Sequence, residues 1–397
     1  MGVRPVGVSI GSIAKFFPRQ QMEEILRAAG REGQRRRKLP SMELMYYLVA
    51  LGLHASEGCR SVLRKIVLRK ASSEEEDLES ISSDSAISQA RARLGWEPLR
   101  ELYLRIVRPI ATRASIGAWY RRWRLVTLDG SCLDVADTKR NERAFGRPGA
   151  SRGKAGFPQL RFVTLLENGT HVMFGAELGR YSNGEATLAK KVIPRLPADA
   201  LCLADRNFFS YSLWKAALGT GASLLWRARA DLVLPKLKRL SDGSYLSKIY
   251  PSPRAREKDV DGIVVRLIEY RLGPKGSQVY QLLCSILDPR KAPAIQLANL
   301  YPQRWTIETA LAELKTRLRG AHVVLRSRVP ALTRQDFYGL LLAHFGVRAL
   351  MHEAALEQKC DATDLSFIHA VRTVARYLPL YVSFFPSKEE ALPVTLT

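Results

Sequence analysis

The sequence has few cysteines and histidines, and neither residue type clusters. Five cysteines and six histidines are scattered along the 397 residues. We therefore predict neither a disulfide framework nor a zinc site built from closely spaced Cys and His ligands. We interpret the cysteines as reduced, mostly buried apolar side chains. Any metal bound by this chain is expected to have oxygen ligands, which favours Mg²⁺ or Mn²⁺.

Long apolar runs are also lacking. No run approaches the ~18 residues that a transmembrane helix needs. The N-terminal segment has no apolar stretch and cleavage site of the kind found in signal peptides. The sequence therefore predicts no membrane partner and a cytoplasmic location, which in a bacterium means the nucleoid. There is no phosphate-binding G-x4-G-K-[ST] motif and no H-E-x-x-H motif, so the ATPase and zinc-protease classes have no support.

Acidic residues are outnumbered by basic ones. The chain carries 62 Lys and Arg against 38 Asp and Glu, a formal net charge of +24. Such an excess favours a polyanionic partner, and nucleic acid is the commonest one. An anionic membrane surface is the weaker alternative, because no long basic amphipathic helix is evident. The length and the 46% apolar content predict two or three globular domains.

The N-terminal region is predicted to be helical. Residues 20–70 suggest helices, including one over Met42–Leu53 with Ser41 as its N-cap. A basic cluster, Arg35–Lys38, precedes this helix and is either a solvated turn or a phosphate contact. The acidic, serine-rich stretch 72–84 is typical of a linker or loop.

A helix pair follows this linker. Ser85–Leu94, with Ser85 as its cap, and Leu99–Ile106 are predicted helices on either side of Gly95. Two short helices around a glycine turn can form a helix-turn-helix, in which Arg91 and Arg93 would face DNA. Ordinary helix pairs have the same pattern, so that alternative stays open.

The pattern changes to strands from residue 124, and one helix lies between the third and fourth of them. The dipeptide Asn168–Gly169 between two β-rich runs predicts a hairpin. The order of elements is that of the ribonuclease H-like fold, in which the first and fourth strands are neighbours. Asp129 and Asp205 directly follow those two strands, and ligand sites gather at such strand ends. The predicted elements are strands 124–128, 160–166 and 171–178, helix 185–196, strand 200–204, helix 212–218 and strand 223–227.

The rest of the chain suggests an insertion and then helices. Short strands at 232–237, 263–272 and 279–286 predict a β-rich insertion into the α/β domain, and helices follow from 295 to about 378. The predicted fold class is thus α/β, with a ribonuclease H-like core, a β-rich insertion and an N-terminal helical domain. Its segments are a helical DNA-binding region 1–118, the first part of the core 119–229, the insertion 230–290, and the second part of the core with the C-terminal helices 291–397.

One stretch, Tyr301–Gly320, combines functional groups on a predicted helix. At ~100° per residue, four polar side chains share a face within roughly 60°, with an apolar stripe beside it. The alternative is an ordinary surface helix on which Arg304 and Glu308 form a solvated ion pair. The polar face consists of Tyr301, Arg304, Glu308 and Lys315, and the stripe of Ile307, Leu311, Leu314 and Leu318.

These four residues have the spacing Y-x2-R-x3-E-x6-K. This spacing resembles the signature of cut-and-paste transposases of the insertion sequence four family. The segments Leu128–Gly146 and Leu203–Ser210 resemble the segments around that family's first and second catalytic aspartates. The resemblance covers roughly residues 120–350.

The resemblance implies an activity and a metal site. Asp129, Asp205 and Glu308 would be the catalytic triad of a DDE transposase and would bind two Mg²⁺ ions, for which Mn²⁺ could substitute. Two-metal phosphoryl transfer needs several converging carboxylates. The implied reaction is excision, through a DNA hairpin, and strand transfer of an insertion sequence. The implied partners are double-stranded DNA at the element ends and the target, and a second copy of the chain, rather than a membrane or a small-molecule substrate.

The resemblance also implies DNA contacts. Tyr301, Arg304, Lys315 and Arg206 would contact phosphates near the cut. An aromatic side chain would stack on a flipped base, with Tyr280 as first candidate, Trp226 as second and Trp305 in the same wall. Each aromatic has the alternative of being an ordinary core residue.

Each residue has a simpler interpretation on its own. Asp129–Gly130 could be a hairpin turn, Asp205 could cap the next helix, and Arg206 could be a salt-bridge partner. At the level of the whole chain, two alternatives remain: a metal-dependent nuclease without strand transfer, and a non-catalytic DNA-binding descendant of a transposase. The joint pattern, not any one residue, favours the transposase.

Overall fold

The structure is a computed structural model. It describes residues 15–32, 39–67, 83–150, 153–154, 156–229, 231–271, 279–320 and 323–377. The basic cluster at 35–38 and most of the acidic stretch 72–84 lie outside the described residues. The chain forms two compact units: unit 1 contains Met1–Ile110, Leu133–Pro158 and Ala312–Thr397, and unit 2 contains Ala111–Cys132 and Gln159–Leu311. Each unit thus gathers separate stretches of chain.

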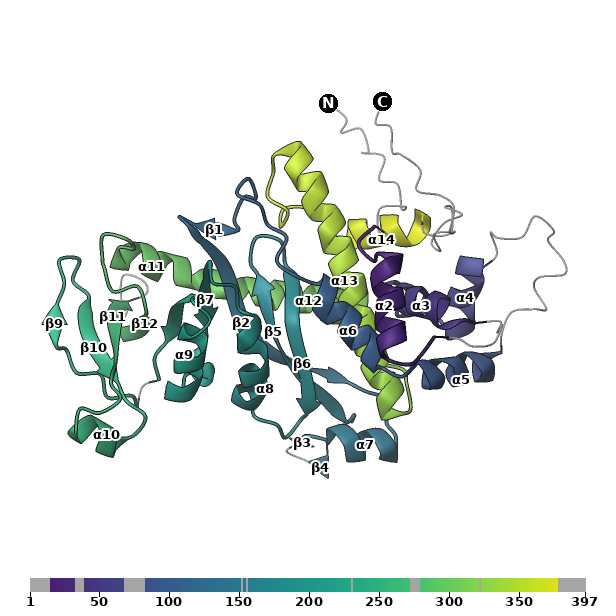
Figure 1. Ribbon diagram of the computed structural model, residues 1–397, viewed down its shortest axis with the longest axis horizontal. Helices are drawn as coiled ribbons and strands as arrows, with labels where there is room; N and C mark the ends of the chain where they lie inside the picture. The colour runs from purple at the N-terminus through teal and green to yellow at the C-terminus, as the bar shows by residue number, and fades with distance from the viewer. Residues whose placement is uncertain are drawn as a thin grey trace. The chain divides into compact units, whose positions relative to one another are not determined.

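Unit 1 is mainly helical. The long helix α13 packs along α3 (Figure 1). Two glycines allow this packing, because a Cβ on Gly52 would lie 2.5 Å from the carbonyl oxygen of Gly339. The elements of unit 1 are α2 (Arg19–Ala28), α3 (Ser41–Leu53), α4 (Cys59–Val67), α5 (Asp84–Leu94), α6 (Glu97–Ile106), α7 (Lys139–Phe145), β3 (Gly149–Ala150), β4 (Gly153–Lys154), the π-helix η4 (Glu313–Leu318), α13 (Pro330–Gln358) and α14 (Phe367–Tyr377).

The predicted N-terminal helices are present, but their caps differ from the prediction. Ser41 is the first residue of α3 and Pro40 occupies the N-cap position, so the predicted Ser41 cap is wrong. The side chain of Ser83, not of Ser85, caps α5 by accepting a hydrogen bond from Ala86 N at 3.2 Å. The predicted Ser85 cap of α5 is therefore wrong. Ser83, two residues earlier, has the extended backbone that capping requires.

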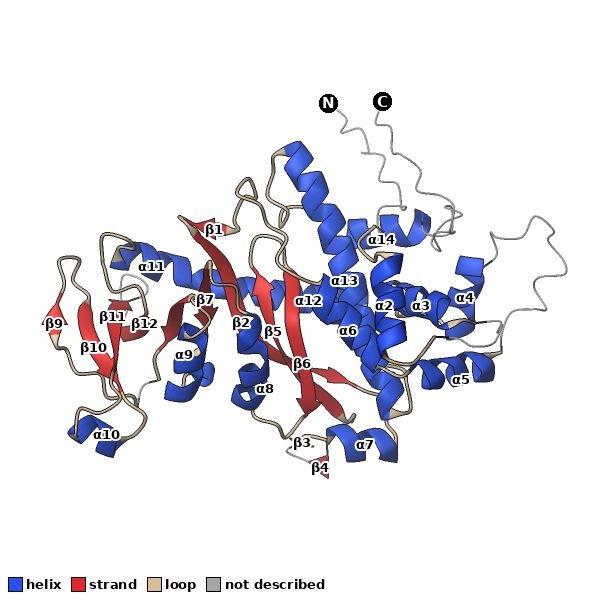
Figure 2. Cartoon of the chain, viewed as in Figure 1, coloured by secondary structure: helices blue, strands red, loops and turns tan. Residues whose placement is uncertain are grey.

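Unit 2 contains a mixed sheet whose strands are drawn in red in Figure 2. The strand order is β6-β5-β2-β7-β8-β12-β11-β10-β9, with β1 pairing on β2. The first five strands give the order of the ribonuclease H-like fold, with β2 between β5 and β7, as predicted. The strands are β1 (Trp119–Tyr120), β2 (Trp123–Asp134), β5 (Gln159–Glu167), β6 (Val172–Arg180), β7 (Ala200–Ala204), β8 (Ser223–Arg227), β9 (Lys238–Arg239), β10 (Tyr245–Ile249), β11 (Ile263–Arg271) and β12 (Val279–Cys284).

Helices cover both faces of this sheet, as the alternation along β8 shows. Leu225 belongs to a buried cluster with Leu297 and Leu300 of α11. The next residue, Trp226, packs on Trp214 of α9 with ring centroids 5.2 Å apart. Successive strand residues point to opposite faces, so α11 and α9 lie on opposite sides of the sheet. The helical elements of unit 2 are α8 (Glu185–Val192), η1 (Ile193–Arg195), η2 (Arg206–Phe208), α9 (Tyr211–Leu218), α10 (Pro253–Glu257), α11 (Ala294–Leu300), η3 (Tyr301–Trp305) and α12 (Thr306–Ala312).

The predicted β-rich insertion extends the core sheet and is not a separate layer. Its last strand, β12, pairs antiparallel with β8, and β11, β10 and β9 follow outward. The predicted strand at 232–237 is wrong, since these residues have no regular structure and include Pro235, which cannot donate to a strand ladder. The strand β10 was not predicted.

The hairpin at Asn168 is present with a longer loop than predicted. β5 and β6 are antiparallel, but the last register pair is Glu167 with Val172, so four residues form the connection. His171 in this loop has a φ of 57°. The loop packs closely, since a Cβ on Gly169 would lie 2.5 Å from Ala118 N. The glycine is therefore needed for close packing.

The predicted continuous helix Tyr301–Gly320 is wrong in its regularity. The stretch begins as the 3₁₀ turn η3, continues as α12 and ends as the π-helix η4. In η4 the buried Glu313 accepts hydrogen bonds from Arg348 Nε at 2.9 Å and contacts His344 Nε2 at 3.3 Å, both in α13. The predicted apolar stripe is buried throughout. Because a π-helix has more residues per turn, a constant angle of 100° does not hold beyond residue 312.

In the part of the chain that the structure describes, no helix is both long enough and apolar enough to span a membrane. None of the five cysteines is in a disulfide; Cys202 and Cys284 are buried and the other three are partly exposed.

Candidate functional site

The pairing of β2 with β7 brings Asp129 and Asp205 next to each other. β2 and β7 are parallel neighbours, and their last register pair is Leu128 with Ala204. Asp129 and Asp205 are the next residues on the two strands and are therefore neighbours. Leu125 and Leu203 belong to the cluster that α11 covers, so alternation directs both aspartates to that face.

The simpler interpretations of both aspartates are wrong. β2 continues through Asp129 to Asp134, so Asp129–Gly130 is not a hairpin turn. Asp205 occupies the N-cap position of η2, but its side chain makes no capping hydrogen bond. Ser210 instead caps the following helix α9, accepting from Leu213 N at 3.2 Å. Neither aspartate side chain is thus needed to form a turn or to cap a helix.

Asp129 is a largely buried carboxylate with one cationic partner. Its Oδ1 accepts from Gly130 N at 2.8 Å, and its Oδ2 faces Arg304 Nη1 at 3.3 Å. Burial raises the pKa of Asp129 from 3.8 to about 6, although the Gly130 amide and Arg304 oppose the rise. The neighbouring carboxylates of Glu185 and Asp205 raise it further. A bound cation would relieve this repulsion.

Arg304 faces Asp129, not Glu308. Only 6% of Arg304 is exposed, and its guanidinium carbon lies 4.3 Å from the centroid of the Trp305 ring. Within the described ranges, the surface ion pair between Arg304 and Glu308 that sequence alone could not exclude is not formed. Glu308 is exposed in the first turn of α12, one helical turn after Arg304. Glu308 thus lies four residues after the arginine that contacts Asp129.

Tyr301 contacts the protein backbone. It is 5% exposed, and its hydroxyl donates to Ala204 O at 3.2 Å. Burial strongly raises the pKa of the Tyr301 phenol, which stays protonated. Its predicted place on a DNA phosphate is therefore wrong for this structure: Tyr301 fixes the end of β7 next to Asp205.

Asn168 is a member of the site that sequence reasoning placed only in a turn. It is 2% exposed and connects two elements of the site. Its Oδ1 accepts from Thr127 Oγ1 at 2.9 Å, and its Nδ2 donates to Gln303 O at 2.8 Å. Thr127 lies two residues before Asp129, and Gln303 directly precedes Arg304. Asn168 thus ties the strand of Asp129 to the turn of Arg304.

Glu185 is a further carboxylate that sequence reasoning left without a role. It begins α8, and its side chain lies against the backbone of Gly130. A Cβ placed on Gly130 would be 2.9 Å from Glu185 Oε1 and 3.1 Å from its Cδ. Glycine after Asp129 therefore gives this carboxylate room beside the site. The glycine is the signal in the sequence, although it also fits the alternative of a hairpin turn at Asp129–Gly130.

The aromatic candidates differ sharply in exposure. Trp226 is fully buried against Trp214, so the prediction that it stacks on a base is wrong. Tyr280 is partly exposed, 5.5 Å from Tyr270 between ring centroids, and Arg227 lies 4.8 Å above its ring. Trp305 is 55% exposed. Large aromatics at central strand positions pack into the core, which explains Trp226.

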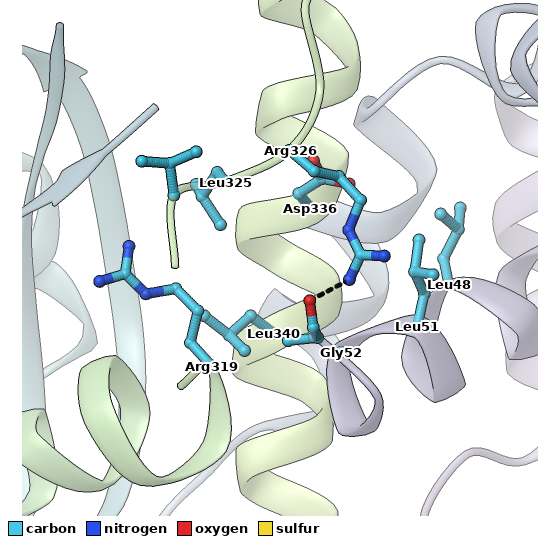
Figure 3. A pocket seen from close by; sticks show the side chains of 10 residues that line it. Leu48, Leu51, Gly52, Arg319, Leu325, Arg326, Asp336 and Leu340 are labelled. Carbon is cyan, nitrogen blue, oxygen red and sulfur yellow. Dashed lines mark hydrogen bonds between the residues drawn. The ribbon is translucent and has the colours of Figure 1, made fainter. Parts of the chain in front are cut away.

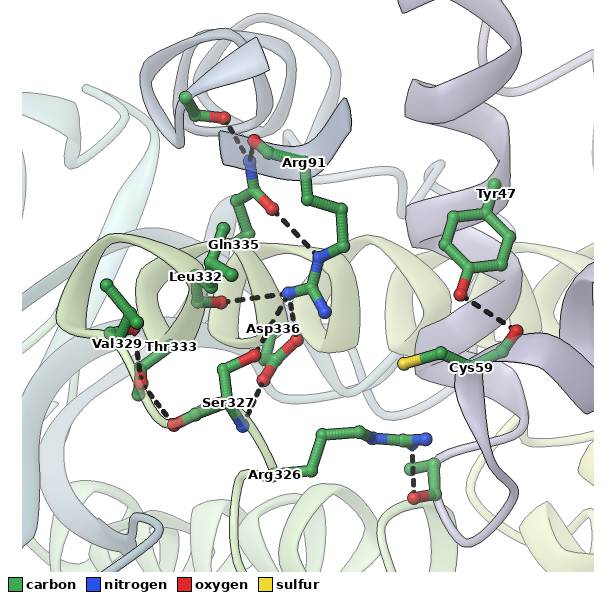
Figure 4. A network of polar contacts seen from close by, with 12 residues as sticks. Tyr47, Cys59, Arg91, Arg326, Ser327, Val329, Leu332, Thr333, Gln335 and Asp336 are labelled. Atoms are coloured by element: carbon green, nitrogen blue, oxygen red, sulfur yellow. Dashed lines mark hydrogen bonds and ion pairs between the residues drawn. The ribbon is translucent and has the colours of Figure 1, made fainter. Parts of the chain in front are cut away.

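Arg91 does not face solvent. It is 3% exposed and lies in a polar network within unit 1 (Figure 4). It donates to Asp336 Oδ1 at 2.6 Å and to Gln335 Oε1 at 3.1 Å. The prediction that Arg91 faces DNA is therefore wrong, because this arginine holds α5 to α13. Arg93, two residues on, is exposed and stays a DNA-contact prediction.

The remaining predicted contacts are Arg206 and Lys315. Arg206 is exposed, directly after Asp205. Lys315 is partly exposed and belongs to the π-helix of unit 1, so the shared face with Glu308 that a regular helix predicts does not follow. A cavity in unit 1, between α3 and α13 (Figure 3), contains none of the predicted site residues.

The donor chemistry of the site fits an oxygen-binding cation. Within the described ranges, no three His, Cys, Asp or Glu side chains stand close enough together to hold a metal ion. The two neighbouring aspartates and Glu185 nevertheless supply only carboxylate oxygens, and one of them, Asp129, is a largely buried carboxylate with a raised pKa. Such ligands suit Mg²⁺ and Mn²⁺.

The strand order defines a ribonuclease H-like protein, together with an aspartate inside β2 and another directly after β7, where the pairing of these two strands ends. Comparison with known families identifies the family within this fold class. Residues 123–345, more than half of the chain, match the family described as "Transposase DDE domain". Residues 7–104 match "Insertion element 4 transposase N-terminal". The chain belongs to the DDE transposases of the insertion element 4 family.

Two relatives come from Escherichia coli K12. The chain is 26% identical over 373 residues to "Transposase InsG for insertion sequence element IS4", covering 92% of this chain and 82% of that protein. It is 23% identical over 214 residues to "Putative transposase InsZ", covering 54% of this chain and 69% of that protein. Among solved structures, the piggyBac transposase in a synaptic complex with hairpin DNA matches with a TM-score of 0.49 and 13% identity, over 99% of this chain and 88% of that one. A likeness of that size supports no inference about this chain.

Proposed function

We propose that this transposase excises and reinserts an insertion sequence by metal-dependent phosphoryl transfer, with Asp129, Asp205 and Glu308 as its catalytic carboxylates. The observation that carries the proposal is the register of β2 and β7, which makes Asp129 and Asp205 neighbours at one strand edge. The position of Glu308 adds support, because it lies one helical turn after Arg304, which contacts Asp129 at 3.3 Å.

Divalent ions, Mg²⁺ or Mn²⁺, would be held by these three carboxylates and, when bound, would activate a water or a 3′-hydroxyl and stabilise the leaving oxygen. The protein's own groups prepare the site. Arg304 and the Gly130 amide orient the Asp129 carboxylate. Tyr301 fixes the backbone before Asp205. Glu185 adds a fourth carboxylate beside Gly130, which increases the negative charge that draws cations to this edge.

The DNA contacts are proposed from exposure and charge. Arg206, exposed directly after Asp205, would bind phosphates near the cut, and Lys315 of unit 1 would bind DNA phosphates. If excision passes through a hairpin intermediate, a flipped base needs an accessible ring. Trp305 is the most exposed of the candidate aromatics and lies three residues before Glu308. The two candidates for base stacking are therefore Tyr280 and Trp305, and Trp226 is no longer one. Because two element ends must be cut and joined together, we propose a homodimer on paired ends.

The proposal is tested with purified protein and duplexes that carry the DNA flanking its own gene. With Mg²⁺ or Mn²⁺, the wild type is expected to cleave at the element ends and to join them to a target plasmid. Glu308→Gln should bind the same duplex with unchanged affinity and should neither cleave nor join. The matched control is Glu257→Gln, the same chemical change at an exposed position of α10, which should retain both reactions.

Full activity of Glu308→Gln would refute the carboxylate assignment. Cleavage without joining by the wild type would show a nuclease and refute the transposition step.

A further inference from the structure

A group of exposed basic side chains lies at the N-terminal end of β2, away from Asp129 in the middle of that strand. The group comprises Arg113, the turn residues Arg121 and Arg122 of the β1–β2 hairpin, and Arg290 and Lys291 before α11. We call these five residues the basic hairpin surface. We propose that it binds the phosphate backbone of duplex DNA at a place separate from the cleavage carboxylates. This inference rests on the proposed function, which supplies the DNA.

The hairpin turn has an unusual composition for its geometry. Tyr120 pairs with Trp123, so Arg121 and Arg122 alone form the connection, and Arg121 has a φ of 54°. Turns of this length favour Asn and Gly, which accept positive φ easily. Residues in such sparsely populated conformations persist where surrounding contacts fix them, and they cluster at binding sites.

Arg121 is fixed by neutral partners, so its charge is not cancelled by them. It donates to Lys291 O at 2.6 Å, to Arg290 O at 3.1 Å and to Gln296 Oε1 at 3.0 Å. These bonds hold the loop before α11 against the hairpin. They bring Arg290, whose side chain is 88% exposed, and Lys291 next to the turn.

Aromatic rings support the other two arginines. The guanidinium carbon of Arg113 lies 3.8 Å from the centroid of the Trp119 ring, and Arg113 Nη1 donates to Arg122 O at 3.2 Å. The guanidinium of Arg122 lies 4.8 Å over Trp123. Stacked guanidinium groups are held in place with less loss of entropy on binding, and their planar fork fits phosphate oxygens.

Acidic residues offset only part of this charge. Arg124, in the same hairpin, pairs with the buried Glu167 and with Asp199, and Arg290 pairs with Asp288. Counting Arg124, six cations stand against three carboxylates, which leaves an excess of three positive charges. Because the exposed charges do not contribute to the core and repel one another, a polyanion is the partner that they fit.

The distance along β2 separates this surface from the cleavage site. Trp123 and Asp129 are six residues apart in one strand, which corresponds to about 20 Å at ~3.3 Å per residue. DNA that reaches both places would span about six base pairs at ~3.4 Å each. Contacts of guanidinium and ammonium groups with phosphates carry no direct sequence information. The surface would therefore add affinity and orientation without sequence preference.

The test removes the three most solvent-directed charges and leaves Arg113 and Arg121, which hold the hairpin together. The variant is Arg122→Gln/Arg290→Gln/Lys291→Gln. Its matched control is Lys190→Gln/Lys191→Gln/Lys215→Gln, which removes three exposed charges from α8 and α9. Affinity for a duplex containing the gene's flanking DNA is measured over a range of salt concentrations for both variants and the wild type.

The surface variant should bind at least about tenfold more weakly at ~0.1 M salt, and its log–log salt slope should be shallower by about 2 to 3, since each phosphate contact contributes ~0.9. The control should change the slope by less than one such contact. At saturating protein with Mg²⁺, the cleavage rate of the surface variant should equal that of the wild type.

An unchanged slope in the surface variant would overturn the inference. An equal reduction in both variants would also overturn it, because net charge alone would then explain the effect. A changed oligomeric state with an unchanged slope would assign the surface to protein contacts instead. Failure of the proposed function has a different signature, since the wild type itself would not cleave while the slopes could still be compared.

Discussion

The raised pKa of Asp129 predicts that the metal-free transposase is destabilised by its own proposed active site. The pKa of Asp129 is about 6 in the folded protein and 3.8 in the unfolded chain. A raised pKa means that folding favours the protonated carboxyl. This contribution to stability is complete below about pH 4 and is lost as pH rises through 6. The shift corresponds to about 3 kcal/mol at ~1.36 kcal/mol per pKa unit, an upper bound for a side chain that is partly exposed.

Asp129→Asn isolates this contribution, because an amide resembles the protonated carboxyl and still accepts the Gly130 amide. Without metal at pH 8, the variant should have a higher free energy of unfolding than the wild type, by up to about 3 kcal/mol. At pH 4 the difference should vanish. Mg²⁺ at pH 8 should stabilise the wild type and leave the variant unchanged, since binding to the folded state alone raises its stability.

The assay is urea unfolding of the full chain at several pH values between 4 and 8, in chelator and in Mg²⁺. The control is Asp231→Asn. Asp231 is an exposed carboxylate that pairs with Arg229, and this pairing lowers the pKa of Asp231. The Asp231→Asn substitution should therefore not stabilise the protein at pH 8. Parallel pH profiles for wild type and Asp129→Asn would refute the reasoning, because burial would then not disfavour the charged form.

Three further predictions concern residues that the structure reassigns. Asn168→Ala removes two side-chain hydrogen bonds of about 0.5–1.5 kcal/mol each and should slow cleavage without changing the salt slope of DNA binding; unchanged cleavage would contradict its positioning role. Trp226→Ala should cost about 3–5 kcal/mol of stability as a core truncation, whereas Trp305→Ala should leave thermal stability unchanged and impair hairpin formation, measured on gels; the reverse pattern would contradict the assignment. Arg91→Ala should lower stability by about 3–5 kcal/mol because it leaves a buried carboxylate unpaired, while Arg93→Ala should only make the salt slope shallower; a stable Arg91→Ala protein with weaker DNA binding would contradict the buried network.

Local sequence patterns predicted the core strands well. β7 and β8 have the predicted bounds, and the neighbouring positions of Asp129 and Asp205 followed from the order of elements. These strands are short apolar runs bounded by turn residues, so their pattern is set by burial on both faces. Family resemblance, not periodicity, then selected the aspartates.

Features that depend on distant residues were not predictable in this way. The π-helix at Glu313 goes with a buried ion pair to Arg348, 35 positions away. The burial of Arg91 depends on Asp336, 245 positions away. The role of Asn168 depends on a carbonyl in η3. A helical wheel assumes one constant angle per residue, and arginine is ordinarily expected at the surface. Both expectations fail where ion pairs form between residues that are distant in the sequence.

The most direct test of Asp129, Asp205 and Glu308 as catalytic carboxylates is an excision assay in cells. The DNA flanking the gene brackets a selectable marker, and the protein is supplied as wild type, Asp205→Asn or Glu308→Gln. Marker loss is expected with the wild type only, with all three proteins present at equal levels. Marker loss with either variant at the wild-type rate would contradict the proposal that these carboxylates carry the reaction.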